Sequence, residues 1–276
     1  MNGPALEVAG LRKEFPANRS DATGASVFVA VDNVGFSIAP GGALAVVGES
    51  GSGKTTLARM VAGLEVPSAG TILVNGRERT AKTRREGRLD YSRGVQMVFQ
   101  DPYSSLDPRQ DVRSCLDEVL RLHHGGSSAQ RSSRITELLH QVGLDDRHAQ
   151  SRPRSLSGGQ RQRVAIARAL VVEPSVLILD EAVAALDVSI QAQVLNLLNG
   201  LRAKLGIAYL FITHDLAVAQ YVCDQMIVMR NGQLIESGPS AEILSSPKHA
   251  YTQRLMEAVP RAGWKPKRRQ TDMANS

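Results

Sequence analysis

Apolar residues follow a strand-like pattern in some segments of this chain and a helix-like pattern in others. Partial alternation with polar residues, typical of half-buried strands, occurs at residues 5–15, 27–31 and 34–38. Short, mostly apolar runs, typical of buried parallel strands, occur at 43–47, 94–99, 176–179 and 208–213. A further strand is predicted at 71–76, where it ends in an Asn-Gly turn, and a terminal hairpin at 226–235.

Helical spacing fills most of the intervals between these strands. Helices are predicted at residues 56–62, 161–172, 190–205 and 216–223. Between Val112 and Gly143, two amphipathic helices are separated by a Gly/Ser-rich linker at 125–128. This block interrupts the alternation of strands and helices, so we predict an α/β fold with a helical subdomain at about 102–165. The charged stretch 77–93 carries no core pattern and is expected to form a surface helix or loop.

Length and composition fit a soluble α/β protein. The chain has 276 residues, 42% of them hydrophobic and 22% charged, which is enough for one large domain with an attachment. No apolar run approaches the ~20 residues that cross a bilayer, and residues 1–7 lack the layout of a signal peptide. The cysteines Cys115 and Cys223 lie in unrelated contexts and are expected to be buried thiols of a cytosolic protein.

The net charge of +6 points to a polyanionic neighbour, such as nucleic acid, anionic lipid or a nucleotide. Nucleic acid is disfavoured because aromatic residues make up only 4% of the chain and form no base-stacking cluster. Basic residues concentrate near the C-terminus, at Arg261, Lys265, Lys267, Arg268 and Arg269. This segment is interpreted either as a soluble tail or as one attracted to the anionic leaflet of a membrane.

The segment Gly48–Thr55 lies between a predicted buried strand and a predicted helix, and it fits the pattern G-x-x-x-x-G-K-[ST]. Its glycines let backbone N–H groups curl around a phosphate, and the following helix points its positive end at the same anion. Lys54 can reach the β- and γ-phosphates of a nucleoside triphosphate, and the Thr55 hydroxyl can bind Mg²⁺. The chain is therefore predicted to bind a nucleoside triphosphate.

Polar side chains follow three of the other predicted strands. Asp180 and Glu181 come after the run 176–179; Asp180 can hold Mg²⁺, and Glu181 can activate a water for attack on the γ-phosphate. His214 closes another strand and can donate a hydrogen bond to the γ-phosphate. Gln100 follows the run 94–99. Taken alone, His214 and Gln100 are equally compatible with ordinary strand ends.

A second glycine-rich segment, Leu156–Gln160, precedes the helix predicted at 161–172. Its serine and two glycines at a helix start form a second anion-binding arrangement, which one bound nucleotide does not need. Together these motifs resemble, over almost the whole chain, those of the ATP-binding subunits of ABC transporters. The motifs are Gly48–Thr55 (Walker A), Gln100 (Q-loop), Leu156–Gln160 (signature), Val176–Asp180 (Walker B), Glu181, Ala185–Asp187 (D-loop) and His214 (H-loop).

This resemblance implies a P-loop NTPase fold of the ABC type, with an antiparallel β edge, the helical subdomain and a short C-terminal extension. It implies ATP and Mg²⁺ as cofactors. It also implies catalytic roles for Lys54, Glu181 and His214, and metal contacts from Thr55, Gln100 and Asp180. The residues expected at the nucleotide are Phe15, Gly48, Glu49, Ser50, Gly51, Ser52, Gly53, Lys54, Thr55, Thr56, Gln100, Ser157, Gly158, Gly159 and Gln160. Phe15 is assigned to adenine stacking, with Phe28 as the alternative.

In the family, two such domains stack head to tail, so the signature of one covers the γ-phosphate held by the other. The resemblance therefore implies a second, different ATPase subunit and two membrane permease subunits as partners. Gln100 and the segment Tyr103–Arg109 would pass closure of the dimer to the permeases. An extracytoplasmic substrate-binding protein would act indirectly, and no nucleic acid partner is expected. The implied location is peripheral, on the cytoplasmic face of the membrane.

A finer resemblance, to importers of di- and oligopeptides, rests on residues 98–109, 186–198 and 246–255. We therefore predict an ABC ATPase domain at 1–237, an importer-type extension with the basic tail at 238–276, and ATP hydrolysis that energises peptide import. Importers of nickel share much of this pattern, so a nickel or other small-solute importer is the alternative.

The chain departs from the family pattern at two points. Ala184 stands where the D-loop usually has serine, which weakens that contact across the dimer. No cysteine follows Cys223, so the iron–sulfur site of some relatives is not expected.

Two other classes of function compete with this interpretation. A soluble ABC ATPase acting on DNA or ribosomes would carry tandem cassettes or long coiled-coil insertions, which this sequence lacks. A structural, nucleotide-gated subunit with little hydrolysis of its own is favoured by Ala184 and opposed by Glu181 and His214.

Overall fold

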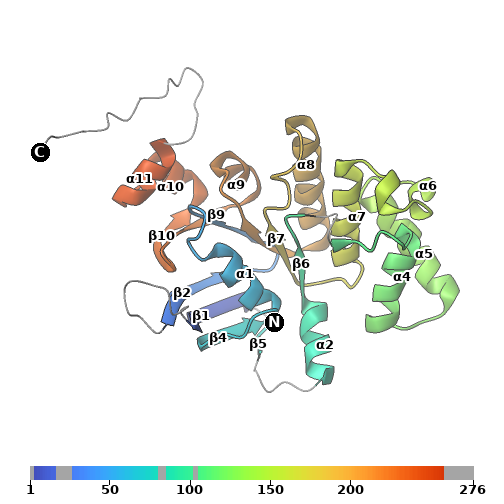
Figure 1. The fold of residues 1–276 in the computed structure, drawn as a ribbon, viewed down its shortest axis with the longest axis horizontal. Coiled ribbons are helices and arrows are strands. Elements are labelled where there is room, and N and C mark those ends of the chain that lie inside the picture. The colour runs from blue at the N-terminus through green and yellow to red at the C-terminus, as the bar shows by residue number, and fades with distance from the viewer. Residues whose placement is uncertain (1–2, 17–26, 80–84, 102–104, 258–276) are drawn as a thin grey trace, which may run out of the picture.

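The computed structural model describes residues 3–16, 27–79, 85–101 and 105–257. Its centre is a six-stranded sheet with the strand order β10-β9-β3-β8-β7-β6 (Figure 1). Neighbours from β9 to β6 run parallel, and β10 runs antiparallel to β9 at one edge. The strands are β3 (Ala43–Val47), β6 (Val95–Val98), β7 (Val176–Asp180), β8 (Ala208–Ile212), β9 (Gln225–Arg230) and β10 (Gln233–Pro239). The predicted buried strands and the terminal hairpin are confirmed.

The central strands are buried along their whole length, as their uninterrupted apolar runs predict. Every residue of β3, β7 and β8 is buried. Successive side chains of β3 point to opposite faces, so that Leu44 and Val46 join one core while Ala45 and Val47 join another. Because parallel strands end at the same edge of a sheet, the residues that follow β3, β6, β7 and β8 are brought together there.

A four-stranded antiparallel sheet, ordered β2-β1-β4-β5, packs with helix α1 (Lys54–Ala62) against one face of the central sheet. Its strands are β1 (Leu6–Pro16), β2 (Val27–Ile38), β4 (Ala69–Val74) and β5 (Arg77–Glu78). The strand segments predicted at 27–31 and 34–38 form one strand. Between the two segments, Asn33 adopts a left-handed backbone with a φ of 51°, and the pairing register with β1 shifts nearby.

Helices cover the opposite face, and Figure 1 shows α4 to α7 gathered on one side of the molecule. They are α4 (Val112–His123), α5 (Ser128–Gln141), α6 (Asp146–Ala149), a 3₁₀ turn at Pro153–Ser155, α7 (Gly158–Leu170), α8 (Val188–Leu205) and α9 (Leu216–Val222). The predicted start of α7 at Arg161 is wrong. The helix begins at Gly158 because the Ser157 side chain accepts a hydrogen bond from the Gln160 N–H and caps it there.

The charged stretch at 77–93 overlaps helix α2 (Arg85–Gly94). One residue of this helix contacts the core, although the composition of the stretch gives no sign of it. Tyr91 packs against the core between the two sheets, and its hydroxyl donates to the Val61 carbonyl over 2.6 Å. The expectation of a purely surface segment is therefore wrong at this residue. A single aromatic residue among charged ones gives no periodic signal.

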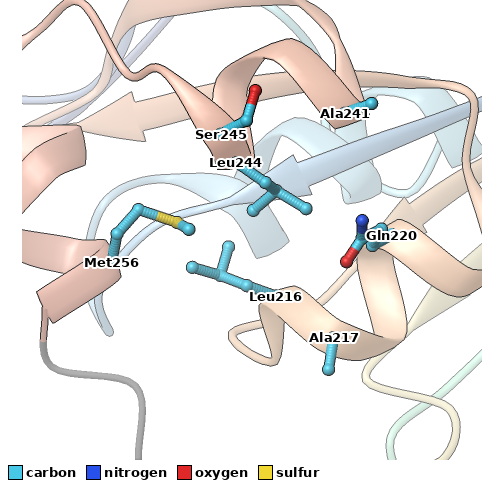
Figure 2. A pocket seen from close by; sticks show the side chains of 7 residues that line it. All are labelled: Leu216, Ala217, Gln220, Ala241, Leu244, Ser245 and Met256. Carbon is cyan, nitrogen blue, oxygen red and sulfur yellow. The ribbon is translucent and has the colours of Figure 1, made fainter. Parts of the chain in front are cut away.

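The described part of the chain ends with α10 (Ser240–Ser245) and α11 (Ala250–Glu257), beside β10 and α9. A pocket of about 320 Å³ opens between these helices and is lined mainly by Leu216, Leu244 and Met256 (Figure 2). None of the predicted site residues lines it. The basic tail lies outside the described residues.

Cys115 and Cys223 are buried and free, as predicted. Among the helices that the structure describes, none combines the length and apolar character that a bilayer crossing requires.

Candidate functional site

The phosphate loop, Gly48–Thr55, connects β3 to α1 and depends on glycine at two places. Gly48 has a φ of 151° and Gly53 a φ of 102°. A Cβ added at Gly48 would lie 2.2 Å from the Met229 carbonyl oxygen, and one added at Gly53 would lie 2.3 Å from that of Ala30. The loop is therefore packed so tightly against β2 and β9 that any side chain at either position would displace backbone.

Lys54 folds back over this loop. Its Nζ donates to the carbonyl oxygens of Gly48 and Glu49, at 2.7 Å each. The residue is buried, and burial lowers the pKa of its amine, an effect opposed by the nearby carboxylates of Glu181, Asp180 and Glu49. A buried cation held only by neutral oxygens is placed to turn toward an anion that enters the loop.

Asp180, the last residue of β7, is a buried carboxylate whose Oδ1 makes no hydrogen bond to any described residue. Burial, together with the charge of Glu181, raises the pKa of this carboxyl to about 6. Its orphaned oxygen suits a hard cation. Within the described ranges, no three His, Cys, Asp or Glu side chains gather into a ready-made cage. The arrangement fits Mg²⁺, which typically uses one or two carboxylates together with substrate phosphates and water.

Two of the predicted residues, Gln100 and His214, contact the carboxylate of a third, Glu181. Gln100, which follows β6, donates through Nε2 to Glu181 Oε2 over 2.8 Å. His214, which follows β8, places Nδ1 3.1 Å from Glu181 Oε1. Glu181 itself has a left-handed backbone with a φ of 48°, an uncommon conformation that a glutamate keeps only when its surroundings impose it. The edge of the parallel sheet thus holds a carboxylate between an amide and an imidazole.

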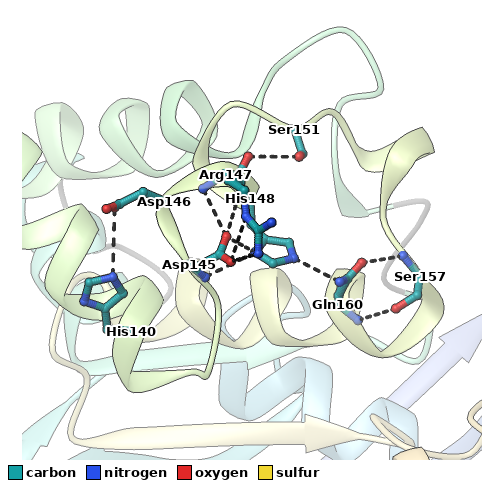
Figure 3. A network of polar contacts seen from close by, with 8 residues as sticks. All are labelled: His140, Asp145, Asp146, Arg147, His148, Ser151, Ser157 and Gln160. Atoms are coloured by element: carbon teal, nitrogen blue, oxygen red, sulfur yellow. Dashed lines mark hydrogen bonds and ion pairs between the residues drawn. The ribbon is translucent and has the colours of Figure 1, made fainter.

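The signature segment is built differently, as a capping box at the start of α7 (Figure 3). The Gln160 N–H donates to Ser157 Oγ over 3.3 Å, and the Ser157 N–H donates to Gln160 Oε1 over 2.9 Å. These bonds leave the Ser157 hydroxyl proton and the N–H of exposed Gly158 available at the helix start, whereas Gly159 is buried. None of the capping bonds reaches Lys54 or Glu181, so within one chain the two glycine-rich segments belong to separate clusters.

His148, on α6, supports this capping box and was not predicted from the sequence. Its Nε2 lies 2.9 Å from Gln160 Nε2, and its Nδ1 lies 2.7 Å from Asp145 Oδ1 (Figure 3). Since the Gln160 oxygen accepts from Ser157, its amide nitrogen is the atom that faces His148, and it can only donate. The imidazole therefore accepts from Gln160 at Nε2, while at Nδ1 it faces both the Asp145 carboxylate and the Asp145 backbone N–H, the latter over 3.1 Å.

The two candidate adenine-stacking residues are neighbours. Phe15 on β1 pairs directly with Phe28 on β2, so both side chains stand on one face of the antiparallel sheet. The ring of Phe15 is half-buried under Lys13, whose Nζ lies 4.8 Å from its centroid, whereas Phe28 is 57% exposed. The choice between them stays a prediction.

Ala184 lies between Glu181 and helix α8. It is exposed, and its N–H donates to the Glu181 carbonyl over 3.0 Å. The D-loop that follows leads to Asp187, the N-cap position of α8. Ala184, which replaces the usual serine, is thus hydrogen-bonded directly to the residue predicted to be the base.

Two protein families match the chain. The family described as "ABC transporter" matches residues 31–184. The family described as "Oligopeptide/dipeptide transporter, C-terminal region" matches residues 235–275. The first match contains the phosphate loop, Gln100, the signature and Glu181, and the second contains α10 and α11.

Curated relatives are similar over nearly the whole chain. It is 40% identical over 261 residues to the dipeptide transport ATP-binding protein DppF of Escherichia coli, covering 95% of this chain and 78% of DppF. It is 45% identical over 259 residues to the glutathione import ATP-binding protein GsiA of Salmonella typhimurium, covering 93% of this chain and 41% of GsiA. The chain thus spans less than half of the length of GsiA.

A dimeric ATP-binding cassette, MJ0796, solved in a post-hydrolysis state bound to ADP and Pi, matches with a TM-score of 0.73 at 26% identity, over 85% of this chain and 98% of that one. The fold is therefore that of an ABC ATPase cassette. With the family match and these relatives, the chain belongs to the ABC transporter family of ATP-binding proteins.

Proposed function

We propose that this chain is an ATP-hydrolysing subunit that energises the import of di- and oligopeptides through separate permease subunits. The observation that carries the hydrolytic role is the Glu181 carboxylate, held between Gln100 and His214 at the sheet edge that also carries the phosphate loop. The peptide cargo is supported by the C-terminal family match at residues 235–275 and by the likeness to DppF.

The phosphate loop supplies binding and charge. Lys54 exchanges its bonds to the Gly48 and Glu49 carbonyls for bonds to phosphate oxygens, while the start of α1 directs its positive end at the same group. Asp180 and Thr55, with Gln100 beside them, would hold Mg²⁺. That ion, when bound, neutralises charge on the phosphates.

Glu181 acts as the general base. Its two oxygens have different partners, so its orientation is fixed while it can still accept a proton from water. His214 is 62% exposed at its side chain, against 21% for Glu181, and this exposure lets it contact a γ-phosphate from the open side of the site. Displacement of the Gln100 amide by an incoming water would free one oxygen of the base.

A second copy of the fold completes the site. Ser157 and Gly158 present donors at an exposed helix start away from Lys54, and this placement suits the nucleotide of a partner subunit. The dimeric cassette bound to ADP and Pi is similar to this chain and supports that arrangement. We propose a heterodimer with a different ATPase subunit, in which Ala184 weakens one contact.

Permease subunits would dock beside Gln100. A groove of about 280 Å³ lies between the sheet and the helical block, next to the end of β6. It includes three exposed large apolar side chains, Phe99 at 38% and Leu64 and Leu122 at 58% each. An apolar groove adjoining a residue that touches the base suits a membrane subunit that must sense closure, and it would place the chain peripherally on the cytoplasmic face. The segment proposed to transmit closure, Tyr103–Arg109, lies partly outside the described residues.

Substitution of the base tests the hydrolytic role. Glu181→Gln keeps the size and the hydrogen-bonding capacity of the side chain but removes its basicity. We expect turnover of the assembled transporter to fall by about 100-fold or more while ATP still binds, and an ATP-bound dimer should accumulate in size-exclusion chromatography. Equal turnover by variant and wild type would show that Glu181 is not the base. A wild-type chain whose assembled complex hydrolyses only at the partner's site would be a structural subunit instead.

A further inference from the structure

The C-terminal region reaches the phosphate loop through one side chain. Tyr251, on α11, is 4% exposed, and its hydroxyl oxygen accepts a hydrogen bond from the backbone N–H of Glu49 over 3.1 Å. The two residues are separated by 202 positions in the chain, and the two family matches meet at this bond. Neither the loop pattern nor the C-terminal sequence predicts it.

The position of Tyr251 is fixed independently of the loop. The Arg230 guanidinium lies over its ring, 4.8 Å from the centroid. The Glu236 carboxylate on β10 accepts from the N–H groups of Lys248 (2.8 Å) and His249 (3.2 Å), which lead into α11. His249 Nδ1 in turn accepts from the Tyr251 N–H over 3.0 Å. The hydroxyl is therefore presented by an anchored helix start.

Glu49 is held on both sides. Its carbonyl accepts from Lys54 Nζ over 2.7 Å, and its N–H donates to Tyr251. When Lys54 turns to a phosphate, as the proposed function requires, the carbonyl keeps only its hydrogen bond from the Ser52 N–H over 3.2 Å, which lies within the loop itself. The bond to Tyr251 then remains as the tie between Glu49 and a segment outside the loop. Without it, the loop would gain freedom that binding must remove again, and removal of conformational freedom costs affinity.

We propose that Tyr251 is a positioning residue of the nucleotide site, whose hydroxyl holds the first turn of the phosphate loop in the shape that accepts the phosphates. The C-terminal region thereby sets the affinity of the chain for ATP. The inference rests on the proposed function only in that Gly48–Thr55 must hold the phosphates.

The test compares two tyrosines. Tyr251→Phe removes the hydroxyl but keeps the ring under Arg230. Tyr209→Phe is the matched control, because Tyr209 is also buried and its hydroxyl donates to the Leu198 carbonyl over 2.9 Å, inside the core. With the full chain and a fluorescent ATP analogue in the presence of Mg²⁺, Tyr251→Phe should weaken binding by about three- to tenfold, the range expected for one hydrogen bond. Tyr209→Phe should leave Kd unchanged. In the assembled transporter, Tyr251→Phe should raise KM for ATP and leave kcat within twofold.

The outcomes separate the inference from the proposed function. If Tyr251→Phe and Tyr209→Phe lower Tm alike and neither changes Kd, Tyr251 is a packing residue and the inference is wrong. Lys54→Ala, measured in the same assay, tests the loop itself: retained affinity would overturn the phosphate assignment. Lost affinity in Lys54→Ala with unchanged affinity in Tyr251→Phe would overturn the inference alone. Faster hydrogen exchange at the Glu49 amide of Tyr251→Phe would confirm that the hydroxyl restrains that peptide.

Discussion

Two glycine-rich segments, each at the start of a helix, are built in opposite ways. In the phosphate loop the N-cap is Gly53, which offers no side-chain cap, so the first N–H groups of α1 face the loop without an internal acceptor. At α7, Ser157 and Gln160 cap each other and satisfy two of the donors that an anion could use. The surroundings differ as well, since Lys54 is buried whereas Ser157 and Gly158 are exposed.

This difference indicates that the two segments have different roles in nucleotide binding. The first segment carries a buried cation, Lys54, and in the proposed function it holds the phosphates within one chain. The second offers the Ser157 hydroxyl and the Gly158 N–H at an exposed surface, and in the proposed dimer it would contact a nucleotide held by the partner subunit. Affinity should therefore reside in the phosphate loop, and sensitivity to dimer closure in the signature.

Asp180, at the end of β7, is a buried carboxylate that destabilises the folded chain when no cation is bound beside it. Its folded-state pKa of about 6 lies above the ordinary aspartate value of 3.8. Below the lower value both the folded and the unfolded states are protonated. As pH rises toward and past 6, ionisation increasingly favours the unfolded state, by about 3 kcal/mol at the upper limit. Asp180→Asn should therefore raise the free energy of unfolding of the nucleotide-free chain at pH 8, with a gain that shrinks as pH falls from 6 to 4.

The measurement is urea unfolding in EDTA between pH 4.5 and 8. A gain that stays constant over this range would contradict the shifted pKa. The same variant should lose the additional stabilisation that Mg²⁺-ATP gives to the wild type, since the carboxylate that would hold the ion is gone.

Ser157→Ala should separate binding from closure. Removal of the hydroxyl takes away one donor to a partner's nucleotide and one acceptor for the Gln160 N–H. We expect ATP affinity of the isolated chain to stay within twofold, and turnover of the assembled transporter to fall by about tenfold, an ordinary loss for one charge-assisted hydrogen bond. A matched loss of affinity in the isolated chain would break the proposed division between the two segments.

His148 should have a smaller effect of the same kind. His148→Ala removes the acceptor that orients the Gln160 amide, so turnover should fall by about threefold, the lower end of the range for one hydrogen bond, with ATP affinity of the isolated chain unchanged. Glutamine at this position can accept from Gln160 while donating to Asp145, so His148→Gln should recover most of the loss. If glutamine and alanine behaved alike, the histidine would serve only to pack α6.

Much of the fold could be predicted because its central strands are buried on both faces and appear as uninterrupted apolar runs. Gly48–Thr55, Asp180 and Glu181 could be found because each lies directly beside such a run. The true start of α7 is hidden because its first turn contains two glycines, which are poor helix formers, and the capping box overrides that preference.

Other residues could not be found or ranked from the sequence. The roles of His148 and Tyr251 arise from contacts with segments distant in the chain, and neither residue belongs to a local pattern. The choice between Phe15 and Phe28 as the adenine-stacking residue stays undecided for a related reason. The two residues are paired across β1 and β2, and the sequence alone does not show which ring would contact adenine.

The burial of both thiols has a practical consequence for experiments that follow closure of the proposed dimer. Cys115 and Cys223 are 9% and 3% exposed, and burial raises the pKa of each, so neither forms the reactive thiolate near neutral pH. A cysteine introduced on an exposed surface, for example in place of Ala192 on α8, would then react with a maleimide dye in preference to the native pair. Spectroscopic reporters of dimer closure can thus be attached without first rebuilding the core.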